Sequence, residues 1–367
     1  MLVVIASNSE ANVLRAAVGP GEGWGPEAGS YSAVMACRVA VSSGTRAASD
    51  ARARNGTVDV VPDLYLAIDI GGTKLTAGIV DEAGAVVIRD RVATPTRDVW
   101  SALARLVKRV VAASPVPPVA CGVGCGGPMV PAKGVVSPLY IPSWRGFDVR
   151  DLLVELTGLP TVVDTEAKAI ASGEAWHGAA RGVDDFIGVV VATGVSGGII
   201  SGGRLLQGRV GNAGHIGHMV VEADGRPCVC GGFGCLDAYC SRQAIEDETG
   251  RAAQRAPRAI IERTGTLVGR ALVSVGAIVD LKMAVIGGTL ALGFGDVFFD
   301  AVRHEVDARA KLGFLQGFTV VPVGLGHHAP LVGAAALARF TLGSPDRAAP
   351  STAGAAPDAS AVGATAR

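Results

Sequence analysis

The stretch Leu66–Val80 constrains the fold of this chain more than any other part of its 367 residues. Leu66–Ile70 is a short apolar run typical of a strand that is buried on both faces, and a second apolar run ends at Val80. Between the runs, Gly71 and Gly72 lack a Cβ, so the backbone can turn tightly and its N–H groups can approach an anion. The sequence predicts a strand–turn–strand unit, which fits a phosphate-binding turn and a plain glycine hairpin equally well.

Polar side chains flank this glycine turn. Asp69 interrupts the first apolar run near its end, where a strand presents its side chain to a cleft. Thr73 adds a hydroxyl donor and Lys74 adds a cation. A phosphate group would fit beside them.

The overall charge excludes some classes of partner. Lys plus Arg is 33 and Asp plus Glu is 33, so the formal net charge is zero, which argues against binding to nucleic acid or membranes driven by charge. No apolar run reaches the roughly 18 residues needed to cross a bilayer. We therefore expect a cytoplasmic protein, in which seven cysteines indicate thiols or metal ligands before disulfides.

The order of the expected elements indicates an α/β protein. The glycine-turn pattern of the first strands recurs at about residues 187–206, around Thr193-Gly-Val-Ser-Gly-Gly198, and two such turns could clamp a polyphosphate from both sides. A third glycine turn is Gly287-Gly288-Thr289. The expected strands are 86–93, 119–124, 161–163, 186–192, 283–286 and 319–323, and the expected helices are 100–113, 149–156, 167–177, 257–279, 297–312 and 331–342.

Two segments between these elements leave alternatives open. The loop 135–144 contains Tyr140 and Trp144 and is either a lid or a packed surface loop. Asp164-Thr165-Glu166 follows a strand directly, a position that usually faces the ligand crevice of an α/β sheet. For Asp164 itself we favour the role of a helix N-cap.

A compact set of His and Cys residues predicts a metal site. His218, Cys228, Cys230 and Cys235 supply one imidazole and three thiolates, a usual set for tetrahedral structural zinc. The alternative is a group of ordinary thiols, but so many ligands in so short a span favour the metal. Cys240 is a possible competing ligand, whereas Cys37, Cys121 and Cys125 are read as inert.

Together, several motifs resemble the ROK family of repressors, open-reading-frame proteins and sugar kinases, over residues 64–342. They are Asp69-Ile-Gly-Gly-Thr-Lys74, Thr193-Gly-Val-Ser-Gly-Gly198, Gly214-His-Ile-Gly-His218 and the three cysteines. The resemblance implies an actin-like ATPase (ribonuclease H-like) fold with two α/β domains, 63–172 and 173–342, around a cleft, with packing of the last helix back on the first domain as an alternative. Residues 1–62 and 343–367 are expected to be a disordered extension and tail, unless the true start codon lies later.

The resemblance also implies cofactors, partners and residue roles. It implies Mg-ATP as donor, a structural zinc, a small-molecule sugar substrate and a homodimer. The implied contacts to ATP and its phosphates are Asp69, Gly71, Gly72, Thr73, Lys74, Thr193, Gly194, Gly287 and Gly288, and Gly127 would line the sugar pocket.

The sequence departs from the family pattern on the sugar side. Thr165-Glu166 stands where the family has Asn-Asp, so Glu166 would be the catalytic base from a shifted position. His215 and Asp237 each stand where the family has Glu, and Tyr140 stands where it has Asn. Because polar sites reject ligands that leave buried groups unpaired, these changes should move specificity away from glucose.

The resulting hypothesis is a kinase that acts on the primary hydroxyl of a modified hexose or a C7 cyclitol of the valiolone type, since family kinases in antibiotic pathways use amino sugars and such cyclitols. The alternatives are a plain glucokinase and a non-catalytic sugar sensor. A transcriptional regulator fits less well, because residues 1–62 lack the two patterned helices of a helix-turn-helix and the chain is not basic.

Overall fold

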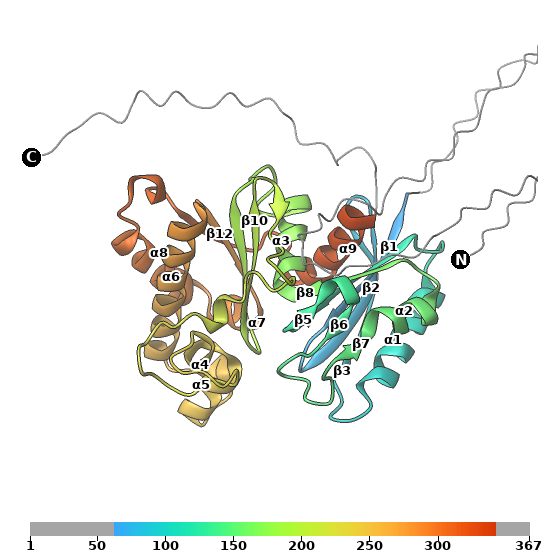
Figure 1. Ribbon diagram of the computed structural model, residues 1–367, viewed down its shortest axis with the longest axis horizontal. Coiled ribbons are helices and arrows are strands. Elements are labelled where there is room, and N and C mark those ends of the chain that lie inside the picture. The colour runs from blue at the N-terminus through green and yellow to red at the C-terminus, as the bar shows by residue number, and fades with distance from the viewer. Residues whose placement is uncertain (1–61, 343–367) are drawn as a thin grey trace, which may run out of the picture. The chain divides into compact units, whose positions relative to one another are not determined.

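The computed structural model describes residues 62–342 (Figure 1). The predictions for the two terminal segments and for Cys37 fall outside that range, apart from residue 62. Within it, none of the helices combines the length and the apolar character that a membrane crossing requires.

The first glycine turn belongs to a five-stranded sheet with the order β3-β2-β1-β4-β8. β1 and β2 form the expected antiparallel hairpin, and β1, β4 and β8 run parallel. Helices α1 and α2 pack against one face of this sheet through apolar side chains. The bounds are β1 (Leu64–Ile70), β2 (Lys74–Asp81), β3 (Val86–Ala93), α1 (Val99–Ala113), β4 (Ala120–Cys125), α2 (Val149–Thr157) and β8 (Thr161–Thr165).

A second five-stranded sheet repeats this strand order as β11-β10-β9-β12-β13. Its β9–β10 hairpin corresponds to β1–β2, so the predicted internal repeat is confirmed. The second glycine turn is shorter than predicted, because residues 195–198 already belong to β10. The bounds are β9 (Phe186–Val191), β10 (Val195–Ser201), β11 (Arg204–Leu205), β12 (Met283–Gly287) and β13 (Thr319–Pro322), with α6 (Arg258–Val279) and α8 (Asp296–Arg309) packed on one face.

Helix α3 (Glu166–His177) contacts both sheets. A Cβ on Gly198 of β10 would collide with the backbone of Lys168, and a Cβ on Gly124 of β4 would lie 3.3 Å from Ala169. Helix α9 (Ala329–Leu342) packs on β1 and β4. The predicted domain boundary between residues 172 and 173 falls inside α3, and the division into two domains stays a prediction.

The remaining elements are short. The loop between β6 and β7 contains buried Ile141 and Trp144, and the Trp144 ring stacks on Phe147 with centroids 4.2 Å apart. This end of the loop is packed. The other elements are β5 (Met129–Val130), η1 (Pro131–Lys133), β6 (Val135–Val136), β7 (Phe147–Asp148), η2 (Ile216–His218), α4 (Asp237–Cys240), α5 (Arg242–Thr249), η3 (Ala253–Arg255), α7 (Thr289–Phe294), η4 (Gly313–Leu315) and η5 (Gly326–His328).

Candidate active site

The candidate site begins where three parallel strands end together. In the register of β1, β4 and β8, Asp69 lies beside Gly124, which lies beside Asp164. Ile70, Cys125 and Thr165 form the next row. Ligands of open α/β sheets bind at this carboxyl edge, so the register brings distant parts of the sequence to one place.

Two carboxyl groups at this edge influence each other. Asp69 is buried, and the loss of water raises its pKa to about 6 against the opposing charges of Lys74 and Arg89. Glu166 is half-buried at the first position of α3, and burial together with the negative charge of Asp69 raises its pKa to about 8. The buried Asp69 Oδ1 has no hydrogen-bond partner among the described residues, so it can accept a ligand.

Hydrogen bonds within the first glycine turn and from Thr94 hold that turn in place. The N–H of Gly71 donates to the carbonyl of Lys74 at 3.0 Å, so it is not available to an anion. The hydroxyl of Thr94 donates to the carbonyl of Gly71 at 2.7 Å, and the N–H of Thr94 donates to Thr73 at 3.1 Å. Of the predicted turn residues, Thr73 is exposed and Lys74 partly exposed.

Three residues predicted for the acceptor lie together. A Cβ on Gly127 would lie 2.6 Å from Nε2 of His215 and 3.7 Å from Cγ2 of Thr165. The Nδ1–H of His215 donates to the carbonyl of Asn212 at 3.0 Å, because a carbonyl can only accept. Burial lowers the pKa of His215, so its Nε2 carries a lone pair that can accept a hydrogen bond from a hydroxyl.

The N-cap prediction for Asp164 is wrong. Strand β8 continues to Thr165 because that residue still pairs with Cys125 of β4. Thr165 is therefore the N-cap, and its hydroxyl accepts from the N–H of Lys168 at 3.3 Å. Asp164 instead accepts from the N–H of Thr165 at 2.8 Å and lies 3.4 Å from Nζ of Lys168.

The buried Lys168 was missed by the sequence analysis. Its Nζ donates to Oε1 of Gln207 and to the carbonyl of Gly211, both at 2.8 Å. Together with Asp164, it ties α3 to the loop that carries His215. A lysine among the small residues of an otherwise apolar helix was the signal that could have identified it.

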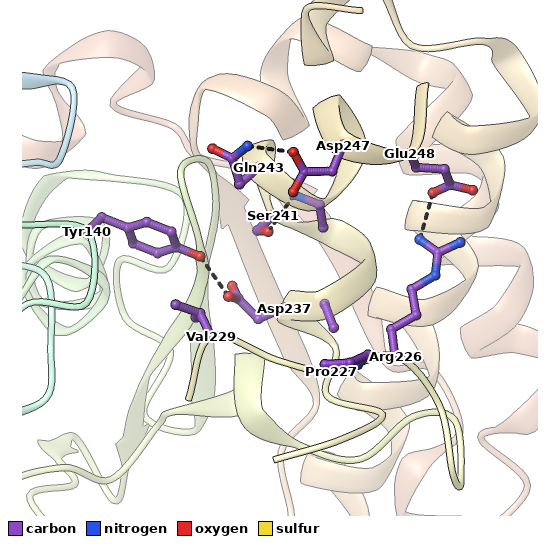
Figure 2. A pocket seen from close by; sticks show the side chains of 11 residues that line it. Tyr140, Arg226, Pro227, Val229, Asp237, Ser241, Gln243, Asp247 and Glu248 are labelled. Atoms are coloured by element: carbon purple, nitrogen blue, oxygen red, sulfur yellow. Dashed lines mark hydrogen bonds and ion pairs between the residues drawn. The ribbon is translucent and has the colours of Figure 1, made fainter. Parts of the chain in front are cut away.

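Tyr140 contacts both the first and the second glycine turn. Its hydroxyl donates to Oδ2 of Asp237 at 2.8 Å, as Figure 2 shows. A Cβ on Gly72 would lie 2.8 Å from the Cβ of Tyr140, and a Cβ on Gly194 would lie 2.8 Å from its ring. Oδ1 of Asp237 accepts from the N–H of Val195 at 2.7 Å. Burial raises the pKa of both Tyr140 and Asp237, and the charge of Asp237 adds to the effect on the phenol.

A pocket of about 490 Å³ adjoins this pair (Figure 2). Tyr140 and Asp237 form one part of its wall, and residues of α4, α5 and the segment 226–229 form the rest. The lining residues are Tyr140, Arg226, Pro227, Val229, Asp237, Ala238, Ser241, Gln243, Ala244, Asp247 and Glu248.

The third glycine turn, at Gly288, packs closely against the end of β9, which leads into the second glycine turn. Gly288 has φ +99, and a Cβ there would collide with the backbone of Val191 at the end of β9. Only glycine fits this close approach. Gly287 faces Val323, with a Cβ 2.8 Å from that side chain. The third turn therefore lies against the end of β9, two residues before Thr193.

The predicted metal ligands come together. The ligand atoms of His218, Cys228, Cys230 and Cys235 all lie within 4.8 Å of one another. Sγ of Cys230 is 3.8 Å from Sγ of Cys235, and the Cys228 sulfur is 3.7 Å from Nδ1 of His218. Tetrahedral zinc with Zn–S bonds of about 2.3 Å separates sulfur ligands by about 3.8 Å, so the set fits that ion.

Cys240 does not compete for this site, which corrects the earlier alternative. It is fully buried in the core, and its sulfur contacts the carbonyl of Thr264 at 3.8 Å. Cys121 and Cys125 are buried, and burial raises the pKa of both thiols.

Comparison with known proteins assigns this chain to a family. The model of the ROK family matches residues 65–340. The chain belongs to the ROK family. That membership, together with the two α/β sheets, confirms the predicted actin-like ATPase fold.

Several known proteins are similar to this chain over nearly their whole length. A glucokinase of Thermotoga maritima is 29% identical, covering 77% of this chain and 100% of its own. An N-acetylmannosamine kinase of Citrobacter koseri is 31% identical, covering 75% and 98%. The structure of a ROK glucokinase from Streptomyces griseus in complex with glucose and AMPPNP is 29% identical, covers 76% of this chain and 99% of its own, and superposes with a TM-score of 0.65.

Proposed function

We propose that this chain is an ATP-dependent kinase that transfers the γ-phosphoryl group to the primary hydroxyl of a sugar or sugar-like polyol. The observation that carries the proposal is the carboxyl pair of Asp69 and Glu166, at the strand edge beside the first glycine turn. Relatives of this chain named as glucokinase and N-acetylmannosamine kinase support the reaction class.

In this proposal Glu166 accepts the proton of the attacking hydroxyl. Phosphoryl transfer depends on positioning and charge stabilisation more than on covalent chemistry. Asp69 would hold Mg²⁺, with its unpartnered Oδ1 turned to the ion's water shell, and the ion would neutralise charge on the phosphates. Lys74 and the turns at Gly72 and Gly194 would hold the phosphates themselves.

We further propose that His218, Cys228, Cys230 and Cys235 hold a structural zinc. Four protein ligands close the coordination sphere, which is typical of a structural ion. The ion would fix the loop that leads to Asp237, two residues after Cys235. We also propose that the chain forms a homodimer, which light scattering on the purified protein tests.

The acceptor we propose is a modified hexose or a C7 cyclitol. Thr165 and His215 lie beside Gly127, Glu166 directly follows Thr165, and all three differ from the family pattern. Nε2 of His215 would accept a hydrogen bond where the family presents a carboxylate. Tyr140 and Asp237 bond each other, so these two positions present less free polar surface to an acceptor. The changes spare the glycine turns and the metal ligands, which argues for altered specificity over lost activity.

Glucokinase activity is the second candidate, because relatives of this chain at 29–30% identity are glucokinases. A phosphorylation panel separates the two: glucose, mannose, N-acetylmannosamine, kanosamine and valiolone, each with ATP and with the product confirmed by mass. Turnover confined to the amino sugar or cyclitol supports the proposal. Equal or better turnover of glucose makes the chain a glucokinase. Binding of ATP without turnover of any acceptor indicates a sensor.

A further inference from the structure

Arg242 lies where the second and third glycine turns meet. It is the first residue of α5, and its backbone N–H donates to the carbonyl of Ala192 at 3.1 Å. Nη2 of its guanidinium donates to the hydroxyl of Thr289 at 3.3 Å. Ala192 directly precedes Thr193, and Thr289 directly follows Gly288, so the arginine contacts both turns.

The guanidinium of Arg242 has mostly neutral hydrogen-bond partners. Its Nε is buried with no partner among residues 62–342. The carboxylate of Glu246 is 4.0 Å from Nη1, at the limit of an ion pair. With its amide turned to present oxygen, Gln254 accepts from Nη2 at 3.1 Å and from Nη1 at 2.5 Å. The nearest partners are therefore mostly neutral, and the side chain is 22% exposed.

We propose that Arg242 binds the phosphate groups of the nucleotide donor, which makes it a second cation of the site besides Lys74. This inference rests on the proposed kinase function, because it places the polyphosphate along the turns at Thr193 and Gly288. An arginine fork binds phosphate oxygens through two N–H groups at once. A half-buried guanidinium between two glycine turns is suited to that role.

The competing explanation is that Arg242 only joins the two turns. It would then stabilise the protein through Thr289 and Ala192 without touching a ligand. The two explanations differ in which part of the nucleotide senses the arginine. A phosphate ligand affects ADP and ATP but not adenosine, whereas a purely structural contact affects all three alike.

The experiment measures binding of adenosine, ADP and ATP by calorimetry, without any acceptor. We compare the wild type with Arg242→Ala, Arg242→Lys and Thr289→Ala. Arg258→Ala is the control, because Arg258 is exposed and Glu262 is its only ion-pair partner within residues 62–342. We expect Arg242→Ala to weaken ADP and ATP roughly 10- to 100-fold, adenosine less than 3-fold, and Arg242→Lys to recover part of the loss. Thr289→Ala should have a much smaller effect on ADP.

The outcomes separate two kinds of failure. The assignment of Arg242 to phosphate would be overturned if Arg242→Ala bound ADP as tightly as the wild type does. It would also be overturned if the variant lost as much affinity for adenosine as for ADP and Thr289→Ala showed the same losses. Either result would leave the kinase proposal intact. Failure of the wild type to bind ADP and ATP would overturn the kinase proposal itself. A thermal unfolding transition checks that each variant is folded. If Arg242→Ala does not fold, the comparison of Arg242→Lys with the wild type still decides the test.

Discussion

The phenol hydroxyl of Tyr140 donates a hydrogen bond of 2.8 Å to Oδ2 of Asp237, joining segments 97 residues apart in the sequence. The bond connects the loop before Ile141 with the segment that follows the cysteine cluster. The ring of Tyr140 lies against Gly194 and its Cβ lies against Gly72, so one residue contacts both turns that we expect to hold phosphate.

We predict that Tyr140→Phe lowers the free energy of unfolding by about 1–2 kcal/mol, because Asp237 loses a donor to a buried carboxylate. Urea unfolding measures it. Tyr65→Phe is the control: the Tyr65 hydroxyl accepts a longer bond of 3.3 Å from Arg339, so a smaller loss is expected. Equal losses in the two variants would contradict a special contribution of the Tyr140 bond.

The buried pair of Lys168 and Asp164 leads to a second prediction. Lys168→Met removes the cation and leaves the carboxylate of Asp164 buried without its charge partner, which should cost about 3–5 kcal/mol. The double variant Asp164→Asn/Lys168→Met removes both charges and should recover much of that loss. Chemical denaturation of the wild type, the single variant and the double variant measures these free energies of unfolding. A loss below about 1 kcal/mol in the single variant would show that the pair is not important for stability.

The His/Cys cluster predicts one bound zinc ion per chain. Metal analysis of the purified protein should find zinc in the wild type and in Cys240→Ser, because Cys240 lies in the core away from the cluster. Cys230→Ser should lose the metal and have a lower melting temperature, since structural zinc contributes directly to folding. Absence of zinc from the wild type, or its retention in Cys230→Ser, would refute the site.

The raised pKa of Glu166 makes stability depend on pH with a definite sign. The folded protein binds this proton more tightly than the unfolded chain does, so the group favours folding below the unfolded pKa of about 4.5 and costs stability as pH rises through about 8. Because Glu166 is half-buried, solvent limits this cost to about 1–2 kcal/mol. The melting temperature of Glu166→Gln, relative to that of the wild type, should therefore rise from pH 5 to pH 9. A difference in melting temperature that stays constant across that range would refute the raised pKa of Glu166.

The sequence predicted those features that depend on local pattern. The hairpin around Gly71 and Gly72, its repeat at 187–206 and the ligand set of His218 follow from apolar runs, glycine pairs and close spacing.

Other features depend on tertiary contacts that no local pattern carries. Asp164 was misassigned because pairing with β4 extends β8 past it. The place of Tyr140 against Gly194 joins residues distant in the chain, and so does the contact of Arg242 with Thr289. Motif spacing indicates which residues share a loop, but only the packing shows which loops share a surface.

The most direct test of the central claim compares the wild type with Glu166→Gln in one measurement, the rate of phosphoryl transfer from ATP to the best acceptor of the panel. We predict a loss of roughly 10²- to 10⁴-fold in kcat with ATP affinity nearly unchanged, and a wild-type kcat/KM that rises with pH through about 8. Retained turnover in Glu166→Gln would contradict the account and move the role of base to another group, with Asp164 the first to examine.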